Sequence, residues 1–253
     1  MSETASLDAL VRASSPDVTI GIGLAEGDER EDELVSRAVF CPTRIYRSPE
    51  RLLSDVGRGV VQAAVRGSLA ASEFLGILRG RHPGVGMRRI ALLATPGGKT
   101  FLLAPVGIDE GGTLKANRTL ARDLADFCRL LGWEPRVAAL SAGRPEDVSR
   151  GRAIAESIRR GELLEELSHV RHFYINIEDA INWGNCIIAP DGVSGNLVYR
   201  TLTHLGGGGS LGALYFPLEL HAADTSRSGT VEEYLGAIAL ANIGHRGQAR
   251  EFT

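Results

Sequence analysis

A short turn near the C-terminus combines residue types that bind oxyanions. Residues 224–228 read Asp-Thr-Ser-Arg-Ser, and Thr230 and Glu233 follow three residues apart, which is the spacing of a capping box that opens a helix. A helix N-terminus offers backbone N–H groups and a positive dipole end, and Arg227 would add a bidentate guanidinium. We therefore predict an oxyanion site, with phosphate as its natural ligand, formed by Thr225, Ser226, Arg227 and Ser228. The alternative is a turn that is merely polar.

A second polar turn follows the aliphatic run at 186–189. Asp191 lies in a Pro-Asp-Gly sequence, and Ser194 and Asn196 begin the next helical pattern. Because open α/β sheets bind ligands at the carboxyl ends of their strands, these three residues are candidate ligand contacts. The alternative is that Asp191 or Ser194 is the N-cap of the helix. A nucleophile elbow is excluded, because Asn196 stands where that motif requires glycine.

A third turn holds Arg66 and Ser68 among small residues, directly after an apolar run. It would suit an anion, although close packing of small residues at a helix start explains it equally well. Other patterns are weaker. Glu26 breaks a glycine-rich dinucleotide fingerprint, and His169 and His172 lack the spacing of metal ligands and are expected on the surface.

Composition excludes several classes of protein. The chain has 253 residues, 43% apolar and 23% charged, which is enough for one large domain or two modest lobes. With 28 basic and 31 acidic side chains, the net charge of -3 argues against non-specific nucleic-acid binding. No stretch resembles a membrane span or a secretory leader, so we expect a cytoplasmic protein. The three cysteines are far apart and predict neither a disulfide framework nor a metal site.

Aliphatic runs alternate with amphipathic patterns, which is typical of an α/β fold with a largely parallel sheet. Strands are expected at 18–22, 89–93, 100–104, 137–140, 173–177 and 186–189, and helices at 114–131, 154–167 and 194–205. Residues 95–99 predict a hairpin, so the sheets should be mixed, with helices on both faces. Hinge signals at 79–88 and 219–224 divide the chain into a first lobe, 1–87 plus 223–253, and a second lobe, 88–222.

These motifs carry a family resemblance. The order Pro-Asp at 190–191, Gly-Asn at 195–196, a glycine loop at 206–207 and Asp-Thr-Ser-Arg at 224–227 resembles the C-terminal half of phosphate acetyl/butyryl transferases. The Arg66 turn, the hairpin and residues 132–141 resemble upstream segments of the same family. The phrases at 63–69, 104–111 and 189–197 are most similar to the MtxX branch of methanogenic archaea, also called methanogenesis marker protein 4, which is methyltransferase-related.

The resemblance implies the fold shared by phosphotransacetylases and isocitrate dehydrogenases, in which two α/β lobes flank a ligand cleft. It also implies a transferase that moves an acyl group between phosphate and a thiol cofactor such as coenzyme A. We expect no metal, because no cluster of Cys, His and carboxylate residues has the spacing of metal ligands. Glu233 would be the general base, Arg227 would stabilise oxyanion charge and Ser226 would orient the acyl group. Arg66, Ser68 and Asn196 are further candidates to hold phosphate.

One departure leaves the function open. Glu233 stands where phosphotransacetylases carry an aspartate, and its capping-box position gives it a structural explanation as well. The alternatives are a methyltransferase-related protein that binds another phosphorylated cofactor, and a descendant that binds an anion without turnover. The family also dimerises through its second lobe. Because the apolar run at 211–218 is hard to bury in a small lobe, we expect a homodimer.

Overall fold

The computed structural model describes residues 6–251 and divides them into two compact units. The terminal unit holds residues 6–87 and 210–251, and the central unit holds residues 88–209. The sequence predicts the first crossing at 87/88 and the return at 222/223. The structure returns earlier, because β9 (Gly209–Phe216) hydrogen-bonds to β10 (Ala222–Asp224), with Leu214 opposite Ala223. The predicted second hinge, 219–224, thus lies inside the terminal unit.

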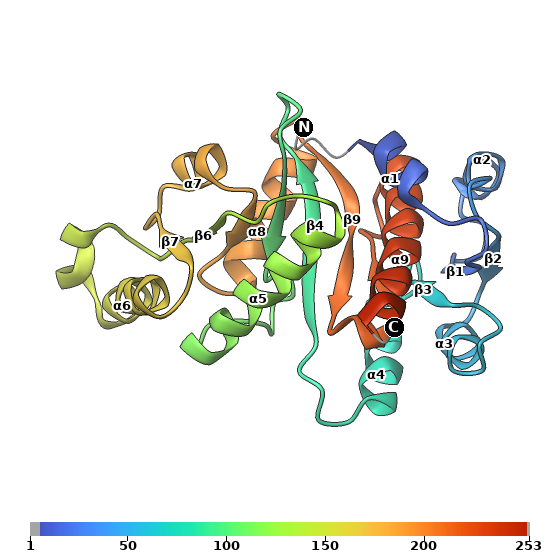
Figure 1. Ribbon diagram of the computed structural model, residues 1–253, viewed down its shortest axis with the longest axis horizontal. Coiled ribbons are helices and arrows are strands. Elements are labelled where there is room, and N and C mark those ends of the chain that lie inside the picture. Colours follow the sequence, from blue (N-terminus) through green and yellow to red (C-terminus); the bar gives the residue numbers. More distant parts are fainter. Residues whose placement is uncertain (1–5, 252–253) are drawn as a thin grey trace. The chain divides into compact units, whose positions relative to one another are not determined.

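Five strands form the sheet of the terminal unit, in the order β2, β1, β3, β10 and β9 (Figure 1). Strands β1 (Ile20–Gly23), β2 (Thr43–Tyr46), β3 (Ala63–Val65) and β10 are parallel, and β9 is antiparallel to β10. The three strands β1, β3 and β10 are nearly free of polar side chains and are fully buried, as expected for a parallel sheet covered on both faces. Their carboxyl ends therefore meet at one edge.

Helices cover both faces of this sheet (Figure 1). α1 (Leu7–Ala13), α2 (Glu31–Arg37) and α9 (Val231–Glu251) pack together, and α3 (Pro49–Gly57) packs against α4 (Ala71–Arg81). A short 3-10 helix, Leu218–Leu220, precedes β10. No helix within residues 6–251 is both long and apolar enough to cross a membrane.

The apolar run that motivated the homodimer prediction is covered by the chain itself. Leu214, Tyr215 and Phe216 of β9 are each at most 3% exposed, and Tyr215 packs with Phe74 in the core between the sheet and α3 and α4. A second copy is not needed to bury this run. The homodimer stays a prediction, but the apolar run at 211–218 no longer supports it.

The central unit has a mixed sheet in the order β4, β5, β8, β6 and β7. The predicted hairpin is present, because β4 (Arg88–Ala94) and β5 (Thr100–Ala104) are antiparallel with Ala94 opposite Thr100. Strands β5, β8 (Cys186–Ile188), β6 (Val137–Ala139) and β7 (Val170–His172) are parallel. The prediction of a strand at 173–177 is wrong: β7 lies earlier, and Tyr174, with a φ of 55°, follows its end.

Helices α5 (Leu114–Leu130) and α6 (Arg152–Leu167) pack together, and α7 (Ile177–Trp183) and α8 (Gly192–His204) lie on the other face of the sheet (Figure 1). A 3-10 turn, Pro145–Arg150, precedes α6. The predicted α/β class, with mixed sheets and helices on both faces, is confirmed in each unit.

Candidate anion-binding site

The turn predicted to bind an oxyanion lies at the carboxyl ends of three parallel strands in the terminal unit. β10 runs directly into Thr225, β3 into Arg66, and β1 into the segment that leads to Asp28. Because β10 is parallel to β3 and β3 to β1, these polar residues meet at one sheet edge. The strand order thus assembles side chains that are far apart in the sequence.

Arg66 stabilises the turn at residues 225–228 through an ion pair and hydrogen bonds. Its guanidinium Nε pairs with the Asp224 carboxylate at 2.5 Å, and its terminal nitrogens donate to the carbonyl oxygens of Leu69 and Thr225. Arg66 is only 5% exposed, and Tyr215 donates to the other Asp224 oxygen at 2.9 Å. The sequence predicts Arg66 as a ligand contact. The structure gives it a positioning role instead, because its donors are directed at the chain itself.

Ser68 and Thr225 are also held by internal contacts. The Thr225 hydroxyl donates to the Gly67 carbonyl oxygen at 3.0 Å, and this side chain is buried. The Ser68 hydroxyl donates to Asp28 at 2.5 Å and accepts from the Ala25 N–H at 2.8 Å. Both predicted ligand residues therefore join the turn to neighbouring loops and offer little to a ligand.

The start of α9 carries the Thr230 cap of the predicted capping box. The Thr230 hydroxyl accepts from the Glu233 N–H at 3.3 Å, as predicted, but the Glu233 carboxylate accepts from the Ser226 N–H at 2.7 Å. Glu233 is 5% exposed, and a Cβ at Gly229 would lie 2.3 Å from its Oε2, so the turn wraps closely around this carboxylate. Two N–H groups expected to face an anion are therefore used by the protein itself.

Arg30 also stabilises the backbone of this turn. Its Nη1 donates to the carbonyl oxygens of Arg227 at 2.9 Å and Gly229 at 2.7 Å, while Nε and Nη2 donate to Asp28 at 2.7 and 2.8 Å. The guanidinium lies 4.5 Å from the centre of the Tyr234 ring. Hydrogen bonds from Arg30 lower the pKa of Asp28 to about 2. Asp28 therefore remains ionised and keeps Arg30 in place.

The sequence analysis does not predict this Arg30 clamp, in which Arg30 pairs with Asp28 and donates to the turn. The signal for it in the sequence is an acidic and a basic residue, Asp28 and Arg30, shortly after the glycine-containing strand β1. That signal becomes informative only when β1 is known to lie beside β3, because the contact between Arg30 and Gly229 spans 199 residues.

What remains for a ligand is one cation and two hydroxyl groups. The Arg227 side chain is exposed and forms no hydrogen bond or ion pair within residues 6–251. The hydroxyl groups of Ser226 and Ser228 lie 3.1 Å apart on the same turn. A guanidinium beside hydroxyl donors, on a backbone fixed by Arg30, Arg66 and Glu233, can bind an oxyanion through charge-assisted hydrogen bonds.

The predicted ligand residues of the central unit have structural partners. Asp191 is the N-cap of α8, accepting from the Ser194 N–H at 2.8 Å, so the capping interpretation is confirmed. Asn196 donates to the Val106 carbonyl oxygen at 3.0 Å. The Asn196 contact joins α8 to the segment that follows β5. Of the three, only Ser194 has a partly exposed side chain without a described hydroxyl contact.

His172 contradicts the expectation of a surface histidine. It is 7% exposed, its Nε2 lies 3.0 Å from the Ser141 hydroxyl, and its ring centre lies 4.2 Å from that of Tyr174. Burial lowers the pKa of His172. Gly161 of α6 leaves room for the ring, since a Cβ there would lie 2.3 Å from Nε2. His169, by contrast, is exposed as predicted.

Comparison with known proteins places the chain in a family. No model of a known protein family matches the sequence. The "Putative methyltransferase mtx subunit X" of Methanosarcina mazei is 42% identical over 214 residues, which are 80% of this chain and 74% of that protein. The chain belongs to the mtx subunit X family. An uncharacterized methyltransferase of Methanocaldococcus jannaschii is 32% identical over 231 residues, covering 84% of this chain and 93% of the relative.

Solved structures of low sequence identity share the fold. The crystal structure of a branched-chain phosphotransacylase from Enterococcus faecalis gives a TM-score of 0.66 at 17% identity and covers 90% of this chain and 99% of that one. The EutD phosphotransacetylase from Staphylococcus aureus gives 0.60 at 16% identity, covering 94% and 97%. The sequence resemblance to the mtx subunit X branch is therefore confirmed, and the chain shares the fold of these phosphotransacylases, as the resemblance implies.

Proposed function

We propose that this member of the mtx subunit X family binds a phosphorylated ligand at residues 225–228, as part of a methyl-transferring system. The exposed Arg227 guanidinium carries this proposal, because it stands on a turn whose other charged groups are paired internally. A fixed backbone lowers the entropic cost of ordering the site around an anion. Relatives named as a methyltransferase subunit, at up to 42% identity, support the methyl-transfer assignment.

The ligand class follows from the donors. Arginine binds phosphate through two parallel N–H groups, and the Ser226 and Ser228 hydroxyls can donate to the remaining oxygens. A phosphorylated cofactor, coenzyme A included, meets these requirements. The proposal needs no metal ion, since the contacts are hydrogen bonds from protein groups.

Acyl transfer is the second candidate, and the phosphotransacylase fold favours it. A thiolate would attack the carbonyl carbon of an acyl phosphate, the carbon–oxygen bond to phosphate would break, and phosphate would leave. Glu233 would take the thiol proton, Arg227 would stabilise the oxyanion and Ser226 would orient the acyl group. This role requires the buried Glu233 carboxylate to release the Ser226 N–H and reach the thiol.

Thermal stability in the presence of ligands tests both candidates. A ligand at about 100 times its Kd adds about 2.7 kcal/mol of stability, which raises the melting temperature measurably. Inorganic phosphate, acetyl phosphate, coenzyme A and phosphorylated methyl-transfer cofactors form the panel. We expect at least one phosphorylated compound to stabilise the wild-type chain and not Arg227→Ala. Stabilisation of both alike, or of neither, would contradict the site.

Acyl transfer is then measured directly with acetyl phosphate and coenzyme A. If Glu233 is the base, Glu233→Gln abolishes transfer while phosphate still binds. If the wild-type chain binds phosphate and transfers nothing, the binding function stands and the acyltransferase candidate fails.

A further inference from the structure

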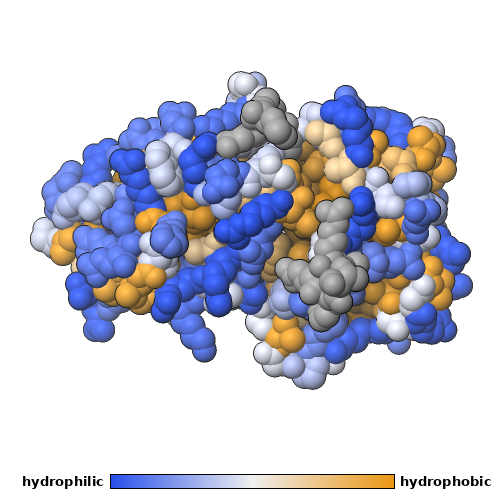
Figure 2. Space-filling view, viewed as in Figure 1, coloured by the Kyte–Doolittle hydropathy of each residue, from blue (hydrophilic) through white to orange (hydrophobic). Residues whose placement is uncertain are grey.

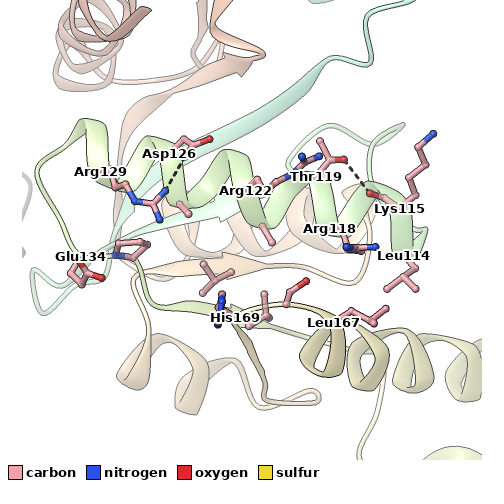
Figure 3. Close-up of a pocket in the computed structure, with 16 residues that line it drawn as sticks. Leu114, Lys115, Arg118, Thr119, Arg122, Asp126, Arg129, Glu134, Leu167 and His169 are labelled. Atoms are coloured by element: carbon pink, nitrogen blue, oxygen red, sulfur yellow. Dashed lines mark hydrogen bonds and ion pairs between the residues drawn. The ribbon is translucent and has the colours of Figure 1, made fainter. Parts of the chain in front are cut away.

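A long groove in the central unit lies along α5. Its volume is about 1130 Å³, and it is lined by α5, by Glu134, Pro135 and Val137, and by residues 167–170 at the end of α6 and the start of β7. Figure 3 shows Leu114 and Arg118 opposite Leu167 at one end, Arg129 and Glu134 at the other, and His169 between them. The groove belongs to one unit and contains none of the predicted anion-site residues.

One wall of the groove is a stripe of cations. Lys115, Arg118, Arg122 and Arg129 are exposed and follow each other on α5 at intervals of three, four and seven residues, so they share one helical stripe. Within residues 6–251 the first three form no ion pair, while Arg129 pairs with Asp126 at 2.9 Å. With four basic and two acidic side chains, the lining carries a net charge of +2 in a chain of net charge -3.

The facing wall carries an apolar strip. Leu167, which is 51% exposed, and Pro135, which is partly exposed, form this strip above a floor of Val137 and Val170, and Glu134, Ser168 and His169 line the same wall. Leu114, also partly exposed, lies opposite Leu167 at the start of α5. Figure 2 shows hydrophilic residues over α5 beside a hydrophobic patch over α6. A cationic stripe beside an apolar strip is complementary to a surface with an acidic stripe beside an apolar one.

We propose that this groove binds an acidic amphipathic helix of another protein. The cations extend from Lys115 to Arg129, which is 14 residue steps along α5, or about 21 Å at a rise of ~1.5 Å per residue, and a helix of about four turns can follow them. A single phosphate group reaches only neighbouring cations of such a stripe. A two-fold contact with a second copy would bring two positively charged linings together. No aromatic side chain other than His169 lines the groove to stack nucleic-acid bases.

The test uses a defined probe, because the partner is not identified. A fluorescein-labelled peptide of about 20 residues, designed as a helix with one glutamate stripe and one adjoining leucine stripe, is titrated with the protein and followed by anisotropy. A second peptide carries glutamine in place of glutamate. We expect the glutamate peptide to bind at least about tenfold more tightly, and its affinity to fall as salt is raised.

Two pairs of variants locate the binding surface. Arg118→Glu with Arg122→Glu should weaken the glutamate peptide at least about tenfold, whereas Arg159→Glu with Arg200→Glu, the same charge change outside the groove, should not. Leu167→Ser should weaken binding, whereas Leu197→Ser, at a position on α8 that is 60% exposed, should not. Unchanged melting temperatures show that each variant is folded.

Several results would overturn the proposal. It is wrong if the two peptides bind the wild-type chain equally, or if the groove and control variants lose affinity alike. Displacement of the peptide by micromolar pyrophosphate would assign the groove to a small anion instead. A dimer in light scattering that the Arg118→Glu and Arg122→Glu pair converts to monomer would assign it to a second copy.

Discussion

Two strand–turn–helix connections in this chain look alike in sequence and differ in structure. In the central unit, Asp191 follows β8 and itself caps α8. In the terminal unit, Asp224 ends β10, and the helix cap, Thr230, comes only after a five-residue turn. The shorter connection uses its polar groups to start the helix. The longer one needs side chains from other parts of the chain to fix its backbone.

The difference shows which polar residues remain for a ligand. Asp224, Thr225 and Glu233 are each buried and bound to the chain, as Asn196 is held by Val106 in the other unit. Arg227 alone among the predicted charged contacts of both turns has no partner within residues 6–251. Polar residues at the end of a strand therefore indicate a ligand site only if their side chains are not already bound to other parts of the chain.

The largest loss of stability should come from removing Arg66, which stabilises the longer turn. Arg66→Ala leaves the Asp224 carboxylate buried without its ion-pair partner, and we expect a loss of about 3 to 5 kcal/mol in the free energy of unfolding. Asp191→Ala in the shorter turn should cost only about 1 kcal/mol, the usual effect of losing an N-cap. Urea titration of both variants measures the contrast, and equal losses would refute it.

Glu233 should show an intermediate effect that depends on its hydrogen bond to Ser226. Glu233→Ala leaves the Ser226 N–H without its acceptor, and we expect a loss of about 1 to 3 kcal/mol. Glu233→Gln keeps an acceptor oxygen and should lose less. Denaturant titration compares the two variants; a glutamine variant as unstable as the alanine variant would show that the charge, and not the hydrogen bond, holds the turn.

The Arg30 clamp should make the terminal unit sensitive to acid. The folded pKa of Asp28, about 2, lies below its ordinary value of 3.8, so its stabilising contribution is complete above that value and is lost as the pH falls toward 2. Arg30→Gln should lower stability at neutral pH and make this part of the acid dependence shallower. Unfolding free energies at pH 6 and pH 3 check the prediction. An unchanged acid dependence would show that Arg30 does not lower the pKa of Asp28.

The smallest effect concerns the buried histidine of the central unit. Burial lowers the folded pKa of His172 below 6.5, so the unfolded chain binds a proton that the native chain does not. Stability should therefore fall as the pH decreases below 6.5. His172→Gln should reduce that dependence, while His169→Gln, at an exposed position, should leave it unchanged. Melting temperatures between pH 7.5 and 5.5 decide this, and matching slopes for the two variants would contradict it.

Local signals predicted much of the fold. The hairpin at 95–99 and the helix at 114–131 were visible because turn residues and helical periodicity lie within one segment. The strand at 170–172 was misplaced because its register depends on pairing with Val137, which lies 33 residues away. The return crossing was misplaced for the same reason, since β9 is assigned to its unit only by pairing with β10.

The candidate site shows the same difference between local contacts, which the sequence predicts, and distant contacts, which it does not. The sequence predicts Thr230 as a cap, and offers Asp191 or Ser194 as a second cap, because a cap and its N–H donor lie three residues apart. Arg66 was predicted to contact a ligand because its partner, Asp224, lies 158 residues away and is not apparent from the sequence. Whether an arginine side chain is free to bind a ligand depends on such distant contacts. The sequence could therefore identify Arg227 as a candidate ligand contact, but it could not distinguish Arg227 from Arg66.

Calorimetric titration of inorganic phosphate into wild-type, Arg227→Lys and Arg227→Ala chains tests the anion site most directly, with Arg51→Ala as a control at an exposed position on α3. Lysine keeps the charge but loses the bidentate geometry, so phosphate affinity should fall about tenfold or more in Arg227→Lys and further in Arg227→Ala. Melting temperatures should not change, because the Arg227 side chain makes no described internal contact. Equal phosphate affinity in all four chains would contradict the assignment of residues 225–228 as an anion site.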